Sequence, residues 1–334
     1  MRRKEDGEGM SESECLAVST PEELLAGGIG RFCAAIGIFD GVHLGHRSVL
    51  EHLGEMSRAS GCGSVAITFS PHPKSVLDPA NAPRLLIPPE EKRELLRRCG
   101  ICAVLTIPFT RELASLSAEE FLEDILNRSR NDLCGLCVGK RFRCGRAGSG
   151  TTDKLSEFAK KHELKFEPVS EVRIGGELVS SSAIRLAAAS GELEKVRRYQ
   201  GRPLALYGTV GRGFGVAGTE LGAPTANLLT EYGVLPPNGV YAGMAVLEGN
   251  RFPAAVNIGT APTFAGTPTA SKSVRVEVHL LDFHGDLYGR RMSLELFRKI
   301  REERRFGTPA LLKEQIARDT AAIRTILKEG AEKW

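Results

Sequence analysis

Residues 34–46 read AAIGIFDGVHLGH, and this stretch decides how the first half of the chain is interpreted. An apolar run of strand type covers Phe32 to Ile38, breaks at Asp40-Gly41, and gives way to a helical pattern from about His46 to Arg58. That order places the turn and the helix N-terminus at the carboxyl edge of a parallel sheet, where open α/β folds bind their ligands. The unpaired N–H groups and the positive dipole end of a helix N-terminus favour a phosphate there.

Two histidines, His43 and His46, lie at this turn with Gly45 between them. Their imidazoles can converge on one anion, and Gly45 lets backbone approach the anion closely. Such groups stabilise the charge that grows on a phosphate while a bond to its α-phosphorus forms, and no covalent intermediate is needed. Two histidines near a turn are also compatible with surface residues or a stray metal pair, but the strand–turn–helix context favours phosphate chemistry.

The composition is that of an ordinary globular protein. The 334 residues suffice for about two domains, with 42% apolar and 26% charged residues. A formal net charge of +4 gives no electrostatic argument for nucleic acid. No apolar run approaches the ~20 residues that span a bilayer, and the N-terminus lacks the apolar segment of a secretory signal. We therefore expect a cytoplasmic protein with a short disordered tail at residues 1–14.

The eight cysteines include two CxxC units, Cys99-x-x-Cys102 and Cys134-x-x-Cys137. Paired units can form a zinc site, but their usual separation is ~15–20 residues, whereas 31 residues intervene here. Each unit lies in apolar sequence, where cysteine behaves as a small buried hydrophobe. Core thiols are the favoured interpretation. If the two segments form neighbouring strands, however, the thiols come close and structural zinc stays open.

Strand and helix patterns alternate from Arg31 to about Val169, which predicts a parallel sheet flanked by helices. Beyond the first strand and helix we expect strands at 64–69, 103–107 and 133–138, and helices at 90–98 and 117–127. Ser117 and Glu120 are spaced as a capping box. The strand at 64–69 ends in the polar turn Ser70-Pro71-His72-Pro73, which we expect at the same carboxyl edge as the histidines.

Two later segments carry groups that bind anions. Residues 138–150, VGKRFRCGRAGSG, combine glycines with arginines, although a basic surface loop has the same composition. Residues 179–185, VSSSAIR, put three hydroxyls before a helix expected at 184–190. These hydroxyls are either N-caps or ligands of the β- and γ-phosphates of ATP, with Arg185 beneath them.

The sequence changes in character after Gly201-Arg202-Pro203, which follows a polar helical connector at 191–200. Short strands separated by Gly and Pro turns predict a small antiparallel barrel, closed by an amphipathic helix at about 309–328. The expected barrel strands are 204–210, 239–247, 251–258, 273–281 and 292–297.

The barrel segment carries a second candidate site between Gly213 and Asn227. Gly213 to Gly218 fit GxGxxG, but TELGAP follows and cannot start the helix that a dinucleotide fingerprint requires. A glycine-rich flap over phosphates is the better interpretation. Thr225 and Asn227 are two apart on an extended segment and so point the same way. Their oxygens are hard ligands of the kind that Mg²⁺ takes beside substrate phosphates.

Taken in order, these motifs resemble those of one family. GxFDGxHxGH is similar to the first nucleotide-binding motif of adenylyl- and cytidylyltransferases, and VSSSAIR resembles the ISSTxIR motif of the bacterial bifunctional riboflavin kinase/FMN adenylyltransferase (FAD synthetase) family. PTAN at 224–227 and EVHLLDF at 277–283 are similar to the riboflavin kinase half of that family. The resemblance covers nearly everything from Arg31 to Asp319.

The resemblance implies an α/β plus β-barrel protein. A Rossmann-like nucleotidyltransferase domain with a parallel sheet is expected over 15–186, a helical linker over 187–200 and a riboflavin kinase barrel over 201–334. The barrel is expected to phosphorylate riboflavin to FMN with ATP, and the first domain to transfer AMP from ATP to FMN, which yields FAD and pyrophosphate. Both steps imply Mg²⁺. The implied ligands are riboflavin, FMN, FAD and ATP, with no nucleic acid, membrane or obligate protein partner.

The matched motifs also imply residue roles. The catalytic residues are His43 and His46 in the first domain and Glu277 in the barrel, where Glu277 is the general base for the ribityl primary hydroxyl. The ATP-binding residues of the first domain are Gly37, Phe39, Asp40, Gly45, Ser180, Ser181, Ser182 and Arg185. The phosphate-binding residues of the kinase are Gly213, Gly215, Gly218, Pro224 and Thr225, and the Mg²⁺ ligands are Thr225 and Asn227. The flavin-binding residues are Pro71, His72, Phe142, Arg301, Glu303 and Phe306.

Several positions depart from the family's pattern and keep alternatives open. Departures bearing on the adenylyltransferase half are Ile38, Arg141 and Cys144, and those bearing on the kinase half are Thr219 and Ala261. One alternative is an enzyme that retains only one activity. Another is a non-catalytic flavin-binding regulator, which would bind flavin without turning over ATP. A zinc-binding module built on the CxxC units is a third.

Overall fold

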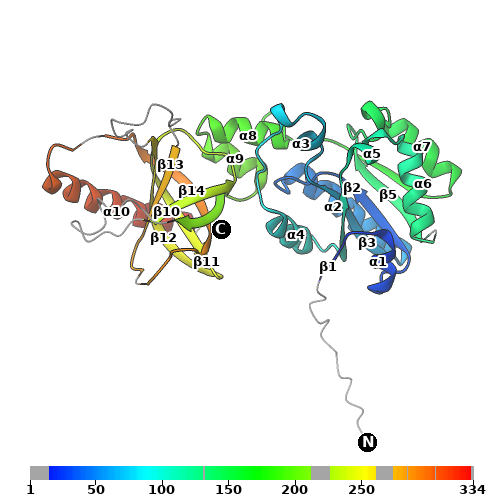
Figure 1. Ribbon diagram of the computed structural model, residues 1–334, viewed down its shortest axis with the longest axis horizontal. Coiled ribbons are helices and arrows are strands. Elements are labelled where there is room, and N and C mark those ends of the chain that lie inside the picture. The colour runs from blue at the N-terminus through cyan, green and yellow to red at the C-terminus, as the bar shows by residue number, and fades with distance from the viewer. Residues whose placement is uncertain are drawn as a thin grey trace, which may run out of the picture. The chain divides into compact units, whose positions relative to one another are not determined.

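The computed structural model describes residues 15–130, 132–211, 226–260, 274–283, 285–304 and 306–331 (Figure 1). The chain divides into two compact units, the first comprising Met1–Pro83 with Pro89–Val172 and the second Arg84–Pro88 with Arg173–Trp334. The tail expected at 1–14 lies outside the described residues. In the described ranges, no helix has both the length and the apolar character needed to cross a membrane.

The first unit is a six-stranded sheet in the order β1-β4-β3-β2-β5-β6, and every neighbouring pair is parallel. Its strands are β1 (Leu16–Val18), β2 (Phe32–Ile36), β3 (Gly63–Ser70), β4 (Ala103–Pro108), β5 (Leu133–Gly139) and β6 (Lys165–Val169). Its helices are α1 (Pro21–Ala26), α2 (Leu44–Ser60), α3 (Pro73–Leu77), α4 (Pro89–Arg98), α5 (Arg111–Ser115), α6 (Ala118–Arg128) and α7 (Thr152–Lys161), with short 3₁₀ turns at Pro79–Asn81 and Arg146–Gly148. The predicted α/β class of this half is confirmed.

Local sequence explains where the main helices begin and end. Before α6, the Ser117 hydroxyl accepts from the Glu120 N–H at 3.1 Å, and the Glu120 carboxylate accepts from the Ser117 N–H at 2.7 Å. The predicted capping box is therefore confirmed. At the other end of α2, Gly61 adopts a left-handed conformation with φ 60°, which glycine takes without a steric cost.

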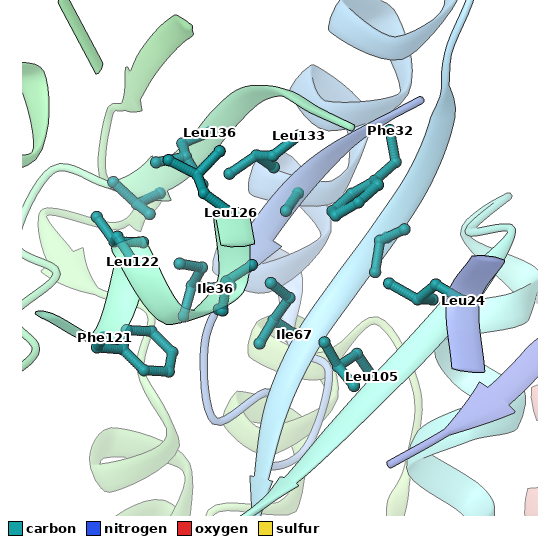
Figure 2. Packing of buried hydrophobic residues seen from close by; sticks show 14 of the residues in the cluster. Leu24, Phe32, Ile36, Ile67, Leu105, Phe121, Leu122, Leu126, Leu133 and Leu136 are labelled. Carbon is teal, nitrogen blue, oxygen red and sulfur yellow. The ribbon is translucent and has the colours of Figure 1, made fainter. Parts of the chain in front are cut away.

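One face of the sheet carries the main hydrophobic core (Figure 2). Alternate strand residues such as Ile36 and Ile67 point to this face and pack against α1, α6 and α7, which contribute Leu24, Leu122 and other apolar side chains. The intervening residues point to the opposite face, where the Cys137 thiol donates to the Val49 carbonyl of α2. The sheet is thus enclosed on both faces, as the near-continuous apolar sequence of β2 requires.

Leu122→Ala should lower the free energy of unfolding of the first unit by about 2–5 kcal/mol, because Leu122 is fully buried and its truncation leaves a cavity. Hydrogen exchange measured by mass spectrometry on peptides from β2 and β5 would report this loss, with barrel peptides as an internal reference. Leu77→Ala is the matched control, since Leu77 is 52% exposed. Equal effects of the two substitutions would contradict the assigned core.

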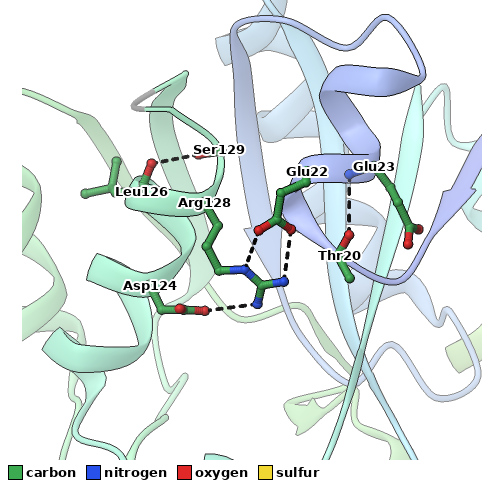
Figure 3. A network of polar contacts seen from close by, with 7 residues as sticks. All are labelled: Thr20, Glu22, Glu23, Asp124, Leu126, Arg128 and Ser129. Carbon is green, nitrogen blue, oxygen red and sulfur yellow. Dashed lines mark hydrogen bonds and ion pairs between the residues drawn. The ribbon is translucent and has the colours of Figure 1, made fainter.

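A polar network on the same unit connects α1 to α6 (Figure 3). The Arg128 guanidinium donates to both carboxylate oxygens of Glu22 at 2.7 and 2.9 Å and to Asp124 at 3.4 Å. The hydrogen bonds from Arg128 lower the pKa of Glu22 to about 2. The side chains of Arg128 and Glu22 are both substantially exposed, so this ion pair contributes little to stability.

The second unit is built around a closed antiparallel barrel in the order β10-β13-β12-β11-β14-β9. Its strands are β9 (Leu204–Gly211), β10 (Ala226–Tyr232), β11 (Gly239–Leu247), β12 (Asn250–Thr260), β13 (Val274–Leu280) and β14 (Arg291–Arg301). The other elements are a hairpin of β7 (Arg173–Ile174) and β8 (Glu177–Leu178), and the helices α8 (Ser181–Ala189), α9 (Leu193–Gln200) and α10 (Pro309–Ala331). The predicted barrel and terminal helix are confirmed, and β10 is a strand that the sequence analysis did not include among those expected.

The two CxxC units do not occupy neighbouring strands. Cys102 immediately precedes β4, whereas Cys134 and Cys137 lie in β5, and the sheet places β3 and β2 between these strands. The expectation that the paired thiols could come close is therefore wrong, because the crossover connections separate segments that look alike in sequence. Within the described residues, no group of three or more His, Cys, Asp or Glu side chains is arranged to hold a metal.

Candidate active sites

The histidine motif lies in a strained turn between β2 and α2. Phe39 and Val42 have φ angles of 52° and 34°, and Gly41 has 87°. Positive φ is unfavourable for residues other than glycine, above all for a β-branched one, so tertiary contacts must hold this backbone. His43 then caps α2, since its Nδ1 accepts from the His46 N–H at 3.3 Å.

The turn brings the two imidazoles together. The rings of His43 and His46 stack with centroids 3.7 Å apart and an interplanar angle of 16°, and the Phe39 ring meets His46 edge-on at 5.3 Å. Asp40 and His43 are only 4% and 5% exposed. A pair of imidazoles at the first turn of a helix is suited to stabilising charge on a phosphate.

Two glycines of the motif have different surroundings. A Cβ on Gly37 would lie 3.0 Å from the Phe39 ring, so Gly37 leaves space for the aromatic side chain that packs against His46. Gly45 lies in the first turn of α2, between the two histidines. The sequence assigned Gly37, Phe39, Asp40 and Gly45 to ATP, and the structure places all four in this one turn and helix start.

The predicted turns of the first unit meet at one edge of the sheet. β3, β2 and β5 are parallel neighbours, and Pro71-His72, the histidine turn and Phe142 follow their respective carboxyl ends. His72 caps α3 by accepting from the Lys74 N–H at 3.1 Å. Phe142 is partly buried and packs against the core. The flavin-binding roles of Pro71, His72 and Phe142 stay predictions.

Lys92 is a residue of this edge that the sequence analysis missed. It lies on α4, and its Nζ donates to the Ile38 carbonyl at 3.3 Å and to the Thr68 hydroxyl at 3.1 Å. Burial lowers its pKa from 10.5 to about 8, and the charge of Asp40 partly opposes this shift. The available signal was helical spacing, because Lys92 is three and four residues before the buried Leu95 and Leu96.

The serine motif belongs to the second unit, where it begins α8. The Ser180 hydroxyl accepts from the Ala183 N–H at 3.2 Å, which makes Ser180 the N-cap, and Ser181 and Ser182 form the first turn. The helix thus starts earlier than the expected residue 184. Arg185 Nε donates to the Arg84 carbonyl at 2.8 Å. Phosphate binding by Ser180, Ser181, Ser182 and Arg185 stays a prediction.

A row of polar side chains crosses three strands of the barrel. Asn227 of β10 pairs with Glu277 of β13, which pairs with Asn257 of β12. Residues directly opposite on neighbouring strands share a face, and the Asn257 amide donates to Glu277 at 3.4 Å. The Asn227 Oδ1 atom is buried and has no hydrogen-bond partner among the described residues. Such an orphaned carbonyl oxygen fits a metal ligand.

The predicted phosphate-binding residues of the barrel all lie outside the described residues. They are Gly213, Gly215, Gly218, Pro224 and Thr225.

The predicted flavin-binding segment follows β14. Glu303 lies close to the polar row, because a Cβ on Gly259 would be 1.8 Å from its Oε1, and Gly259 shares a face of β12 with Asn257. The Arg301 guanidinium donates to the buried Asp319 at 2.7 Å and lies 5.7 Å from the Phe306 ring centroid. Asp319 of α10 therefore holds the Arg301 guanidinium. The contact between Arg301 and the Phe306 ring is the feature that is compatible with flavin binding.

Comparison with known proteins finds a match for each half of the chain. The family model for FAD synthetase matches residues 30–183, and that for riboflavin kinase matches residues 200–327. A bifunctional riboflavin kinase/FMN adenylyltransferase of Pseudomonas fluorescens is 36% identical over 300 residues, which cover 90% of this chain and 94% of the relative. The protein of the same name from Escherichia coli K12 is 37% identical over 290 residues, or 86% and 90% of the two chains. The chain belongs to the bifunctional riboflavin kinase/FMN adenylyltransferase family.

A solved structure supports the fold of this family member. A crystal structure described as a macrolide-efflux protein from Streptococcus pneumoniae has a TM-score of 0.78 and 24% identity, and the match covers 93% of this chain and 98% of that one. At this identity the likeness shows the fold alone.

The family match and the compact units divide the chain differently. The FAD synthetase match runs to residue 183 and so includes Ser180–Ser182, whereas the first compact unit ends at Val172. The sequence assigned 15–186 to the adenylyltransferase domain and 187–200 to a linker, and these boundaries stay a proposal. The range matched by the FAD synthetase model therefore includes both the histidine motif and the start of α8.

Two of the residues that depart from the family pattern, Arg141 and Cys144, lie in the described part of the first unit. Arg141 Nε lies 3.3 Å from the Glu171 carboxylate, which gives it an ion pair beside the sheet edge. Cys144 packs against the core, and burial raises the pKa of its thiol to about 11. Thr219 and Ala261 lie outside the described residues.

Proposed function

We propose that this protein makes FAD from riboflavin in two ATP-dependent steps. The barrel transfers the γ-phosphoryl group of ATP to riboflavin, which yields FMN and ADP. The sheet domain transfers AMP from a second ATP to FMN, which yields FAD and pyrophosphate. The observation that carries the proposal is that matches to both families fall on one chain, each over a segment with its own polar site. We also propose a cytoplasmic location, as the sequence predicts.

In the adenylyltransferase step, an FMN phosphate oxygen attacks the α-phosphorus of ATP and the bond to the pyrophosphate oxygen breaks. The stacked imidazoles of His43 and His46 at the start of α2 are proposed to contact the reacting α-phosphate. Hydrogen bonds from the rings and from the helix N-terminus offset the charge that builds on the α-phosphate oxygens. Ser180, Ser181, Ser182 and Arg185 are proposed to bind the pyrophosphate portion.

In the kinase step, the Glu277 carboxylate accepts the proton of the ribityl primary hydroxyl while its oxygen attacks the γ-phosphorus. The bond from this phosphorus to the bridging oxygen of ATP breaks and ADP leaves. Mg²⁺, when bound, neutralises charge on the ATP phosphates. Asn227 would hold it, as its orphaned buried oxygen supports, together with Thr225. Glu303, Arg301 and Phe306 are proposed to contact the flavin.

Asn227→Ala should raise the Mg²⁺ concentration for half-maximal FMN formation by at least about tenfold, because it removes a ligand oxygen. Titrating Mg²⁺ at saturating ATP and riboflavin measures the shift. Asn227→Asp keeps an oxygen at this position, so it should reach half-maximal FMN formation at a lower Mg²⁺ concentration than the alanine variant. Asn250→Ala, at an exposed position of β12, is the matched control. An unchanged Mg²⁺ requirement in Asn227→Ala would remove Asn227 as a ligand.

The overall proposal is tested by incubating the purified protein with riboflavin, excess ATP and Mg²⁺ and separating the flavins by chromatography over time. We expect FMN to appear first and FAD to follow. FMN without FAD, also when FMN is supplied, would favour an enzyme with the kinase activity alone. Tight flavin binding without any ATP turnover would favour the regulator and overturn the catalytic proposal.

A further inference from the structure

Lys92 connects α4 to the carboxyl edge of the sheet through one backbone carbonyl. Its Nζ donates to the Ile38 oxygen at 3.3 Å and to Thr68 Oγ1 at 3.1 Å. Thr68 is fully buried, and its own hydroxyl donates to the same Ile38 oxygen at 3.0 Å. Two side chains from different elements therefore converge on the carbonyl of Ile38.

The Ile38 carbonyl lies at the start of the strained turn. Ile38 immediately precedes Phe39, whose φ of 52° begins the irregular backbone that ends at His43. A backbone in an unfavourable conformation persists only where its surroundings fix it. Because two donors hold the Ile38 oxygen, the orientation of the peptide between Ile38 and Phe39 is fixed. This peptide leads into the turn, so its orientation also affects where His43 and His46 lie.

The charged ammonium group of Lys92 lowers the stability of the folded protein. Because burial lowers the pKa of Lys92 to about 8 from the ordinary 10.5, the unfolded chain holds this proton more tightly than the native protein. The charge of Lys92 therefore opposes folding at pH 7, and its removal relieves that cost. A neutral side chain would serve a purely structural role better. Buried charges with shifted pKa values gather at functional sites.

We propose that Lys92 is a positioning residue for adenylyl transfer, whose ammonium fixes the Ile38 carbonyl and thereby the turn that presents His43 and His46. This inference rests on the proposed function of the sheet domain. It assigns Lys92 no contact with substrate. The charged group that acts on Lys92 from the turn is Asp40, while β3 presents the neutral Thr68.

The first test is Lys92→Met, which keeps an apolar stem and removes the charge and the donors. FAD formation from supplied FMN should fall about 100-fold in kcat, since a misplacement of ~1 Å at a reacting centre has effects of this size. FMN formation from riboflavin on the same protein should stay unchanged. Lys92→Arg should recover part of the loss because it restores charge and donors. Lys160→Met, an exposed lysine of α7, is the matched control.

Two readouts separate positioning from a structural role. Thermal unfolding of the sheet domain in Lys92→Met should occur at the same or a higher temperature at pH 7, because the charge that opposes folding is gone. The kcat for FAD formation in the unsubstituted protein should decline above about pH 8, as the Lys92 ammonium loses its proton. Lys92→Arg should lack this decline, since a guanidinium stays charged.

The outcomes are distinct. Full FAD-forming activity in Lys92→Met overturns the inference, and so does a fall in its unfolding temperature that tracks the loss of activity. An unsubstituted protein that forms no FAD from FMN overturns the proposed function itself. Loss of FAD formation with intact FMN formation and intact thermal stability supports the positioning role.

Discussion

His46→Ala should lower the rate of FAD formation from FMN by about 10²–10³, while FMN formation from riboflavin continues at the rate of the unsubstituted protein. The size follows from removing one preorganised hydrogen-bond donor at a developing phosphate charge. His46 also stacks on His43 and meets Phe39, so the substitution removes the packing that holds the other ring. Steady-state kinetics with FMN and with riboflavin on one preparation measures both activities.

His52→Ala is the control, because His52 lies on the same helix and its Nδ1 contacts the Ser48 carbonyl at 2.8 Å, away from the turn. It should retain FAD formation. His46→Asn keeps a donor and should fall between the alanine variant and the unsubstituted protein. Loss of both activities in a folded His46→Ala protein would contradict two independent sites.

The sequence predicts what short-range pattern determines. The strand, turn and helix around His43 are recognisable because apolar runs, glycine and capping residues act over a few positions. The same holds for the N-cap at Ser180 and the capping box at Ser117, both of which the structure contains. These local features, together with the motif order, predict the class of both domain folds, although β1, β6 and β10 were not among the expected strands.

The sequence does not show which distant segments become neighbours. The CxxC units look equivalent, yet the sheet order separates β4 from β5 by two strands. The sequence also does not show that the Arg301 guanidinium is held by Asp319, which lies eighteen positions later. The sequence analysis did not single out Lys92, because only tertiary packing brings its side chain to the Ile38 carbonyl. In each case a long-range contact decides where the side chain lies.

The glycine-rich loop after β5 shows the same limit. Its glycines and arginines are compatible with an anion-binding loop, but packing explains two of the glycines. A Cβ on Gly145 would lie 2.5 Å from the Ala118 N atom, and one on Gly150 would lie 2.4 Å from the Ala118 Cβ. The loop is thus pressed against the start of α6, a constraint that composition cannot distinguish from ligand binding.

Glu277→Gln should lower the rate of FMN formation by about 10²–10⁴, the usual contribution of a positioned general base, and leave FAD formation from supplied FMN unchanged. Glutamine keeps the size of the side chain and can still accept from Asn257, so the polar row between β10 and β12 stays intact while the proton acceptor is lost. Glu295→Gln is the matched control, since Glu295 lies on β14 and pairs with Arg251. Kinetics with riboflavin and with FMN separate the two steps. If Glu277→Gln phosphorylates riboflavin as fast as the unsubstituted protein, the proton is accepted by another group, and the polar row would then serve metal binding alone.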